Sequence, residues 1–546
     1  MTQRRTRPTT LRAAIGTILL LSLSATACAG SDSEGDTGAA KLTDNDIPSL
    51  TIALPSPPPS YDRATSTQPI VTGSFMSLVT EPLERVTANG GFTLALAEKV
   101  TQPDPTTIVY KLRSGVRFSD GRPLTAEDVA WSITHTATPP AQTSASVSGF
   151  KSAAVTGPLE VTVKLAGPLP KSRVDIAGAT LIQEKKFATA HAKNLGTPDA
   201  IPIGTGPYEI ASASASGVTL QRRGTYWGEK PKMKTLNVKV ITDDNSAQLA
   251  MRSGEVNLRQ LTNVKTAAQW RSIPGTRVYA SPSGVVNFLA MDVTKAPFDD
   301  VHVRRAISHA TDTPGLVKAA WAGQAAVLKG FVPVENLARV AGGKQNAQKF
   351  LDSLPDHALD LEKAKAELAQ SGHPKGFSTT VEYVDALPAS KVLALSLQQN
   401  LKPLGISITP KSVTLNAWSA KFYQHKLTGL VPAFGFSTSA QDPSSLLSLV
   451  VGKENIGPQK LNIANFTTPE IEKALPAVTT AGADAKRWAA TQTLLSQIAD
   501  QAPYVPLASE KSMVAIGKGF ASASGTIVLN DLFNGNWALN LRATQQ

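Results

Sequence analysis

The stretch FSDGRPLTAEDVAW, residues 118–131, carries the local signals from which we start to predict the fold. Residues 107–112 (TIVYKL) predict a strand before it, and Asp120-Gly121 predicts a turn. Thr125 stands where a helix N-cap belongs, since its hydroxyl can accept from the backbone N–H of Asp128 while the Asp128 carboxylate reaches back. The stretch therefore predicts strand, turn and capped helix, a pattern that a purely local motif also explains.

The sequence around this stretch carries a wider resemblance. EPLERV (81–86), LALAEKV (94–100) and TTIVYKLRSGVRFSDGRPLTAEDVAWS (106–132) follow one another in an order that resembles the signature region of the family 5 extracellular solute-binding proteins. These are the oligopeptide- and dipeptide-binding receptors of ABC importers. The resemblance implies an α/β fold of the periplasmic-binding-protein type (class II), with two lobes and an extra small subdomain in the first lobe.

Composition limits the classes of protein to be considered. With 546 residues, 42% hydrophobic and 18% charged, the chain is long enough to bury large cores. The formal net charge is +12, of which four positive charges (Arg4, Arg5, Arg7 and Arg12) lie in a segment that we expect to be removed, leaving 12 − 4 = +8. Because no basic run is interleaved with aromatic residues, we predict no binding of nucleic acid.

The N-terminus is typical of an exported lipoprotein. Residues 2–12 are rich in arginine, and residues 13–24 are apolar but too short for the roughly 20 residues of a spanning helix. Ala25-Thr26-Ala27 before Cys28 resembles a bacterial lipobox, although Ala25 stands where leucine is more usual. We predict a signal peptide at 1–27, a lipid (palmitate type) on Cys28 and attachment to the outer face of the cytoplasmic membrane. An incidental thiol near a cleavage point is the alternative.

Further segments extend the resemblance along the chain. Residues 29–46 are Gly, Ser and acid, which predicts a flexible tether over 28–46. Residues 74–86 predict a helix entering a strand, residues 201–211 (IPIGTGPYEIA) match a family turn, and residues 287–312 match a family segment whose helix is capped by Asp299 or Asp300. In that helix we expect Arg304 and Arg305 to have structural roles. The resemblance implies one lobe from 47–285 plus 503–546, with a subdomain at about 70–200, and a second lobe from 286–502.

Catalytic motifs are absent from the sequence. None of the seven histidines belongs to an HExxH, HxxxH or Cys/His pattern, and Cys28, the single cysteine, can form neither an intramolecular disulfide nor a cysteine metal site. The chain has no GxSxG elbow and no GxxxxGK[ST] loop. We therefore predict that the protein is not an enzyme and uses neither metal nor cofactor.

The resemblance also implies where a solute binds. The loop after the first strand lines the family's ligand cleft, and here it reads Tyr61-Asp62-Arg63 where Leu-Asp-Pro is usual. Peptide-binding members later read aromatic, two residues, Asp, three residues, Pro, and that aspartate pairs with the ligand's α-ammonium. Residues 436–443 (FSTSAQDP) keep Phe436 and Pro443 but place Ser439 at the acid. We expect the cleft to be lined by Tyr61, Arg63, Phe434, Phe436, Ser437 and Ser439.

The departure at Ser439 bears on the ligand. A serine offers a neutral hydrogen bond, whereas an ammonium buried without a counter-charge is costly. We expect a solute that is neutral or anionic at that end, such as a blocked peptide or a sugar-like molecule. Unmodified peptides remain an alternative if Asp442 or another acid moves in.

The overall prediction is a monomeric substrate-binding receptor of an ABC importer. It captures a peptide or related solute between two lobes and delivers it to a permease and ATPase complex. A sensor or adhesin without transport, and an extracytoplasmic enzyme on the same scaffold, remain alternatives. Neighbouring permease and ATPase genes would argue against the first, and turnover of a substrate would identify the second.

Overall fold

The computed structural model describes residues 41–545 apart from 88–90, 148, 168–171, 215, 356–357, 385–386, 438–441, 459 and 481–482. The described residues belong to one compact unit, Asp36–Gln546. The predicted signal peptide, Cys28 and most of the predicted tether lie outside the described residues. So does Ser439.

An eleven-stranded mixed sheet runs through the described residues. Its order is β16-β15-β17-β13-β18-β12-β2-β11-β10-β9, with β14 beside β18. The strands are β16 (Ser407–Val413), β15 (Ser378–Val384), β17 (Leu430–Ser437), β13 (Arg277–Met291), β18 (Tyr504–Ile516), β12 (Leu258–Gln260), β2 (Ile47–Leu54), β11 (Met233–Val240), β10 (Gly217–Arg222), β9 (Tyr208–Ser214) and β14 (Ala326–Val327). Strand β15 is parallel to β16 and β17, and β2 is parallel to β11 and β12. Helices alternate with these strands, which is the predicted α/β class.

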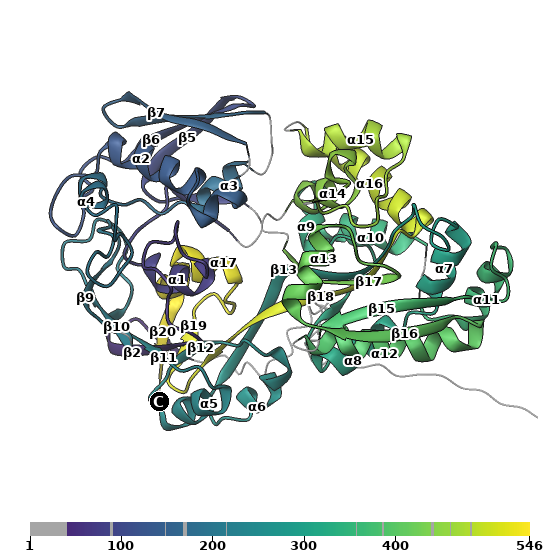
Figure 1. Ribbon diagram of the computed structural model, residues 1–546. Coiled ribbons are helices and arrows are strands. Elements are labelled where there is room, and N and C mark those ends of the chain that lie inside the picture. Colours follow the sequence, from purple (N-terminus) through teal and green to yellow (C-terminus); the bar gives the residue numbers. More distant parts are fainter. Residues whose placement is uncertain are drawn as a thin grey trace, which may run out of the picture. The chain divides into compact units, whose positions relative to one another are not determined.

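Strands β13 and β18 are the longest antiparallel pair of this sheet and cross between separate cores (Figure 1). Near one end, Tyr279, Val514 and Ile516 pack in a core with β2 and β11. Near the other end, Val286, Phe288 and Tyr504 pack in a different core with residues of α14 (Ser444–Val451) and α16 (Asp484–Gln501). The pairing register shifts between Pro282 and Val286, where the two cores meet the strands. These two strands therefore link cores that are otherwise built from different parts of the chain.

The N-terminal and C-terminal elements share the first of these cores. Outside the large sheet, this core contains residues of α1 (Pro69–Met76), α17 (Leu529–Asn534), α18 (Asn536–Asn540), β19 (Phe520–Ser522) and β20 (Leu541–Thr544). Strands β19 and β20 form a small sheet with β1 (Leu42–Thr43). The purple α1 packs against the yellow α17 (Figure 1). The prediction of a helix starting at residue 74 was wrong, because Pro69, with its fixed φ, starts α1 earlier and the chain leaves the helix after Met76.

A four-stranded antiparallel sheet forms a separate core within residues 83–182. It contains β5 (Ala97–Asp104), β6 (Thr107–Leu112), β8 (Glu160–Leu165) and β7 (Phe150–Gly157), with β3 (Glu84–Val86), β4 (Phe92–Leu94), α2 (Ala126–Ala137), α3 (Ser172–Ala179) and α4 (Lys185–Ala190) nearby. The predicted capping box is confirmed: Thr125 Oγ1 accepts from Asp128 N at 3.2 Å, and Asp128 Oδ2 accepts from Thr125 N at 2.9 Å. The other oxygen of Asp128 accepts from Lys185 N, which joins α2 to α4.

Close packing of backbones explains the GTGPY turn. A Cβ atom on Gly204 or Gly206 would overlap the backbone of Val79 or Leu78. This close approach allows two backbone hydrogen bonds: Gly206 N donates to Val79 O at 2.9 Å, and Tyr208 N donates to Leu78 O at 3.0 Å. The two glycines therefore let residues 204–208 lie directly on the segment after α1.

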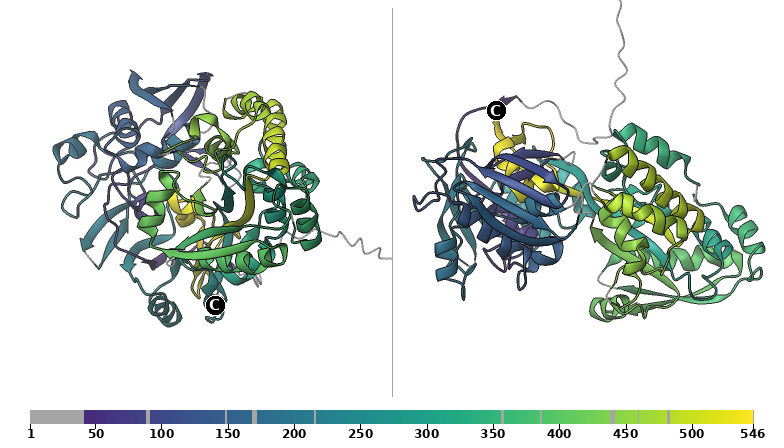
Figure 2. Two further views of the ribbon diagram at one scale, coloured as in Figure 1. Left: turned by 45° about the vertical axis from the view of Figure 1, so that its right-hand side comes forward. Right: turned by 90° about the horizontal axis from the view of Figure 1, so that it is seen from above.

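Helices dominate the remaining cores. They are α7 (Val301–His309), α8 (Thr313–Trp321), α9 (Val334–Leu337), α10 (Lys344–Ser353), α11 (Leu361–Ala369), α12 (Pro388–Leu401), α13 (Leu415–Tyr423), α14 (Ser444–Val451), α15 (Pro469–Thr479) and α16 (Asp484–Gln501), while α5 (Asp244–Ser253) and α6 (Ala267–Arg271) belong to a small core next to β12. Helices α15 and α16 lie side by side (Figure 2).

Helix α7 carries the predicted cap and the two arginines. Of the two candidate caps, Asp300 is the one used, accepting from His302 N at 2.8 Å. Arg304 is buried and donates to the carbonyls of Gln501 and Phe298, and Arg305 donates to that of Asp500. Burial lowers the pKa of Arg304 to about 10. Both arginines join α7 to the end of α16, which confirms the structural roles predicted for them.

Candidate functional site

The loop after β2 is held closely to the rest of the chain. Tyr61 is 5% exposed and presents its ring to Phe75 in an edge-to-face contact, with centroids 6.1 Å apart. Its backbone N–H donates to Gly196 O at 2.7 Å. Burial raises the pKa of the Tyr61 phenol. The structure thus places most of the Tyr61 side chain in the core with α1.

Asp62, the acid that this loop shares with the family pattern, is fully buried and forms hydrogen bonds with three segments of the chain. Its Oδ1 accepts from Gln183 Nε2 at 2.7 Å and from Ala64 N at 3.0 Å. Its Oδ2 lies 2.7 Å from Nε2 of His135, whose ring stacks on Trp131 of α2. A buried carboxylate needs such partners. Asp62 therefore fixes the loop, and with it the position of Arg63.

Arg63 follows directly and is half-buried. Removal of water from the guanidinium lowers the pKa of Arg63 to about 10. Because this value is still far above neutral, the side chain keeps its positive charge at pH 7. The loop after β2 thus contributes a fixed cation.

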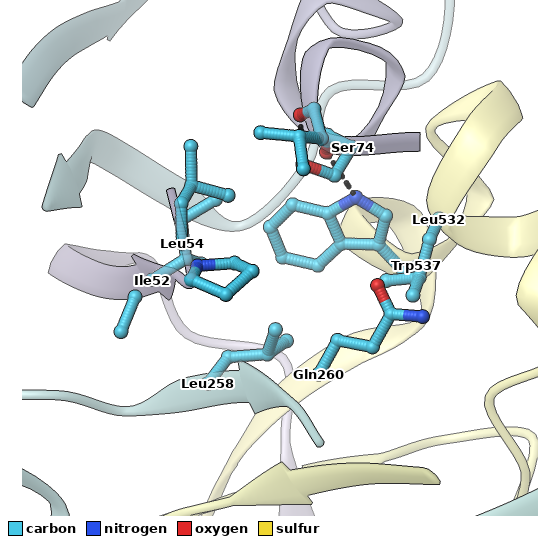
Figure 3. Close-up of a pocket in the computed structure, with 10 residues that line it drawn as sticks. Ile52, Leu54, Ser74, Leu258, Gln260, Leu532 and Trp537 are labelled. Atoms are coloured by element: carbon cyan, nitrogen blue, oxygen red, sulfur yellow. Dashed lines mark hydrogen bonds between the residues drawn. The ribbon is translucent and has the colours of Figure 1, made fainter. Parts of the chain in front are cut away.

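A small pocket lies at the carboxyl ends of the parallel strands β2 and β12 (Figure 3). Leu54 and Gln260 line it from the strand ends, and Ser74 and Trp537 line it from α1 and α18. Trp537 Nε1 donates to Ser74 O at 3.1 Å. The free space is about 20 Å³, which is room for about one water molecule. The pocket is too small for a solute but marks the sheet edge where α/β folds bind ligands.

Strand β17 carries three of the other residues predicted to line the site. Phe434 is half-buried, with its ring 6.3 Å from that of Trp321. Phe436 and Ser437 pair in register with Val286 and Val285 of β13. All three lie at the carboxyl end of β17, whereas Tyr61 and Arg63 lie in the loop after β2. The three residues of β17 thus lie at the carboxyl end of one strand of the mixed sheet, and Tyr61 and Arg63 follow the carboxyl end of another.

Asn287, which sequence reasoning missed, fixes the end of β17 against β13 and β18. Its side chain is fully buried, and Oδ1 accepts from Gly435 N at 3.0 Å. Its Nδ2 donates to Ala508 O at 3.3 Å and to Glu510 Oε1 at 3.1 Å. Asn287 therefore connects β13, β17 and β18 at one point, beside an irregularity in the β13–β17 register.

Asp442, shortly after β17, is buried between two arginines. Its Oδ1 and Oδ2 each accept from Arg487 Nη2 at 2.6 Å, and Oδ2 also accepts from Arg339 Nη2 at 2.7 Å. Ser444 donates to Oδ1 through its backbone N and its hydroxyl at 3.0 and 2.6 Å. Burial raises the pKa of Asp442, but the charge and hydrogen bonds of Arg487 and Ser444 outweigh it and hold the pKa below its usual value.

These contacts bear on the alternative in which Asp442 binds the ammonium group of an unmodified peptide. A carboxylate offers about four acceptor positions, and Asp442 already accepts five hydrogen bonds. The carboxylate is committed to Arg487, Arg339 and Ser444 and has no acceptor position left for the ammonium group of a solute. The hypothesis that Asp442 replaces the acid at Ser439 is therefore disfavoured by the structure.

Sequence reasoning also missed Arg339 and Arg487, although one signal was present. Arg487 lies on the same face of α16 as Ala490, Leu494 and Ile498, which are buried. A charged residue on an apolar helix face predicts a buried partner of opposite charge. Arg339 lies in the turn between α9 and α10, where no such pattern exists.

Within the described ranges, no group of three or more His, Cys, Asp or Glu side chains is arranged to hold a metal ion. No helix in the same ranges has the length and apolar character needed to cross a bilayer.

Comparison with known proteins identifies relatives over most of the chain. The family model described as Bacterial extracellular solute-binding proteins, family 5 Middle, matches residues 91–458, more than half of the sequence. The glutathione-binding protein GsiB of Escherichia coli (strain K12) is 27% identical over 434 residues, which cover 78% of this chain and 81% of GsiB.

Solved structures show the same fold. The ABC transporter substrate-binding protein CtaP of Listeria monocytogenes has a TM-score of 0.76 and 22% identity, covering 92% of this chain and 100% of CtaP. The oligopeptide-binding protein AppA of Bacillus subtilis, in complex with a nonapeptide, has a TM-score of 0.67 and 18% identity, covering 92% and 100%. The predicted fold class, that of periplasmic binding proteins, is confirmed.

Proposed function

The chain belongs to family 5 of the bacterial extracellular solute-binding proteins, and from this premise we propose that it captures a peptide-like solute that is neutral or anionic at one end. As a member of that family it is a substrate-binding component of an ABC importer and not an enzyme. The peptide class is supported by the relatives, since GsiB is named for glutathione and AppA was solved with a nonapeptide.

The observation behind the proposed charge at the end of the solute is that the carboxylate of Asp442 is already occupied by other residues. Its oxygens are occupied by Arg487, Arg339 and Ser444, and the position matching the family's anchoring acid is Ser439. A free α-ammonium would therefore lose a charge-assisted hydrogen bond there, commonly about 1.5 to 3 kcal/mol. Neutral and anionic groups lose nothing comparable.

We propose Tyr61, Arg63, Phe434, Phe436, Ser437 and Ser439 as the residues around the solute. Phe434 offers part of an aromatic face, and Arg63 supplies a charge that persists at neutral pH. Tyr61 takes part mainly by supporting the loop, since most of its ring packs on Phe75. The proposal includes neither a metal nor a cofactor in this site.

The two-lobe arrangement is part of the proposal. One lobe comprises 47–285 with 503–546, including a subdomain at about 70–200, and the other comprises 286–502. The division of the cores along β13 and β18 supports boundaries near Val286 and Tyr504. A monomer that closes on its solute and then engages a permease and ATPase complex fits this arrangement.

A lipid anchor on Cys28 completes the proposal. The Ala25-Thr26-Ala27-Cys28 sequence supports cleavage after residue 27 and acylation of the cysteine. The folded body would then be held at the outer face of the cytoplasmic membrane by a tether over residues 28–46.

Mass spectrometry of the solute that co-purifies with the protein tests the solute class directly. We expect a peptide or peptide-like molecule without a free α-ammonium. Calorimetry then compares a short peptide with its N-acetylated form, and we expect the acetylated form to bind about ten- to a hundredfold more tightly. Tight binding of the free-amine peptide with poor binding of the acetylated one would show that the argument from Ser439 and Asp442 is wrong.

A further inference from the structure

Two arginines share the buried carboxylate of Asp442. Arg487 donates to both oxygens of Asp442 at 2.6 Å, and both side chains are nearly excluded from solvent, with 2% and 4% exposed. This pair alone neutralises the carboxylate. Arg339 adds a second guanidinium at 2.7 Å from Asp442, and Arg487 also lies 3.6 Å from the half-exposed Asp484, so the two positive groups are matched by two carboxylates.

Of the two guanidinium groups, that of Arg339 lies where a solute can reach it. The side chain of Arg339 is 41% exposed, in contrast to Arg487. A guanidinium has five N–H donors, and Arg339 uses Nη2 for Asp442. Because Asp442 is a fixed, buried acceptor, it orients the guanidinium of Arg339 while leaving part of it accessible.

The position of this group in the sheet points to ligand binding. Strands β15, β16 and β17 run in parallel, so their carboxyl ends share one edge. Asp442 follows Ser437, the end of β17, by five residues, and it holds Arg339 beside that edge. Crevices outside the carboxyl ends of strands are where open α/β sheets bind ligands.

From this geometry we infer that Arg339 is a binding residue that receives an anionic group of the solute, a carboxylate or an equivalent oxyanion. The inference rests on the proposed function and specifies the ligand of the same site. Arginine suits this role because its planar fork matches a carboxylate with two parallel hydrogen bonds. Arg339 thus acts as the specificity-determining residue, and Asp442 and Arg487 are positioning residues.

The test uses four trialanine peptides that differ only in the charge of their ends. N-acetyl-trialanine amide is neutral, trialanine amide carries +1, and succinyl-trialanine amide and N-acetyl-trialanine each carry −1, at opposite ends. Calorimetry is performed on protein freed of co-purifying solute by unfolding and refolding. We expect at least one anionic peptide to bind wild type about ten- to a hundredfold more tightly than the neutral one, and the cationic peptide to bind most weakly.

Three variants assign this preference to Arg339. Arg339→Gln should remove the advantage of the anionic peptide, and Arg339→Lys, which keeps the charge but not the fork, should retain part of it. Arg122→Gln is the matched control, because Arg122 is also an exposed arginine, 49% exposed, at 3.3 Å from the buried carboxylate of Glu184. Equal preference in Arg339→Gln and Arg122→Gln, or tighter binding of the cationic peptide by wild type, would overturn the inference.

A separate arm distinguishes this inference from the proposed peptide class. If none of the four peptides binds wild type, the peptide assignment is wrong. Succinate, which has no peptide bond, then tests whether Arg339 binds an anion. At constant ionic strength, succinate should then raise the unfolding temperature of wild type and Arg122→Gln but not that of Arg339→Gln. No rise in wild type, or the same rise in Arg339→Gln, would show that Arg339 receives no anion.

Discussion

At the scale of single residues, Asp442 keeps its charge through the partners of its carboxylate. Among the described residues, two guanidinium groups and Ser444 supply the hydrogen bonds that this carboxylate accepts. Leaving buried charges without their partner is expensive, commonly about 3 to 5 kcal/mol, even where the pair itself adds little to stability. The cluster is therefore sensitive to the loss of any one charge.

We predict that Asp442→Asn lowers the free energy of unfolding by about 3 kcal/mol at pH 7, because the buried Arg487 then keeps only the half-exposed Asp484, 3.6 Å away, as a counter-charge. The pKa of Asp442 is lowered by folding, so its contribution is complete above the unfolded value of about 3.9 and is lost as the pH falls through the folded value. Urea unfolding between pH 3 and 7 should show the difference from wild type shrinking below about pH 4. A variant as stable as wild type at pH 7 would contradict this account.

The matched control is Asp199→Asn, an exposed aspartate with the same chemical change. Surface substitutions of this kind usually change stability by less than about 0.5 kcal/mol. We therefore expect its unfolding curves to follow wild type across the whole pH range.

The sequence could predict residues whose partners are near in the chain and not those whose partners are distant. Thr125 and Asp128 are three residues apart, and both halves of their capping box were predictable. Asp442 and Arg487 are 45 apart, and Asp62 and His135 are 73 apart. Only folding brings such pairs together, so even where a buried charge such as Arg487 is signalled by its helix face, a single sequence does not identify its partner.

At the scale of elements, helix α2 depends on its cap for its start and on one apolar face for its packing. Val129 and Ile133 are fully buried in the core of the four-stranded sheet. The carboxylate of Asp128 bonds both the N-cap residue and Lys185 N. The cap therefore connects the start of α2 to α4 as well as satisfying an unpaired backbone donor.

We predict that Thr125→Ala lowers the free energy of unfolding by about 1 kcal/mol, since the backbone N–H of Asp128 loses its acceptor. Thr134→Ala is the control: Thr134 is exposed on the same helix and bonds only a helical carbonyl among its described contacts, so its loss should be nearly neutral. Thermal unfolding of both variants measures the difference. Equal effects of the two substitutions would show that the cap does not stabilise α2.

The bounds of helices and strands were likewise predictable where nearby residues set them, and not where packing against distant segments set them. Strand β6 has the bounds predicted for it, residues 107–112, because a hydrophobic run marks it locally. Helix α1 starts at Pro69 instead, and the Asn287 bridge among β13, β17 and β18 involves three distant segments. Tyr61 was expected on the cleft wall, but its contact with Phe75 depends on how α1 packs.

At the scale of the whole molecule, β13 and β18 are the chain segments common to the proposed lobes. A solute that touches both lobes stabilises the closed state, whereas one that touches a single lobe does not. We predict that saturation with the co-purifying solute decreases the radius of gyration measured by X-ray scattering. A trialanine peptide that calorimetry shows not to bind is the control, and an unchanged radius at full occupancy would contradict closure between lobes.

Attachment to the membrane is the last property of the whole chain that can be tested. One acyl chain binds a membrane only marginally, while several chains on one cysteine hold firmly. We predict that mature protein begins at Cys28 with added acyl mass, and that Cys28→Ala moves the folded protein from the membrane fraction to the soluble fraction. Ala25→Leu is the matched control, because it brings the sequence closer to the usual lipobox and should leave the protein membrane-bound. Membrane-bound Cys28→Ala protein without acyl mass would show that another part of the chain provides the attachment.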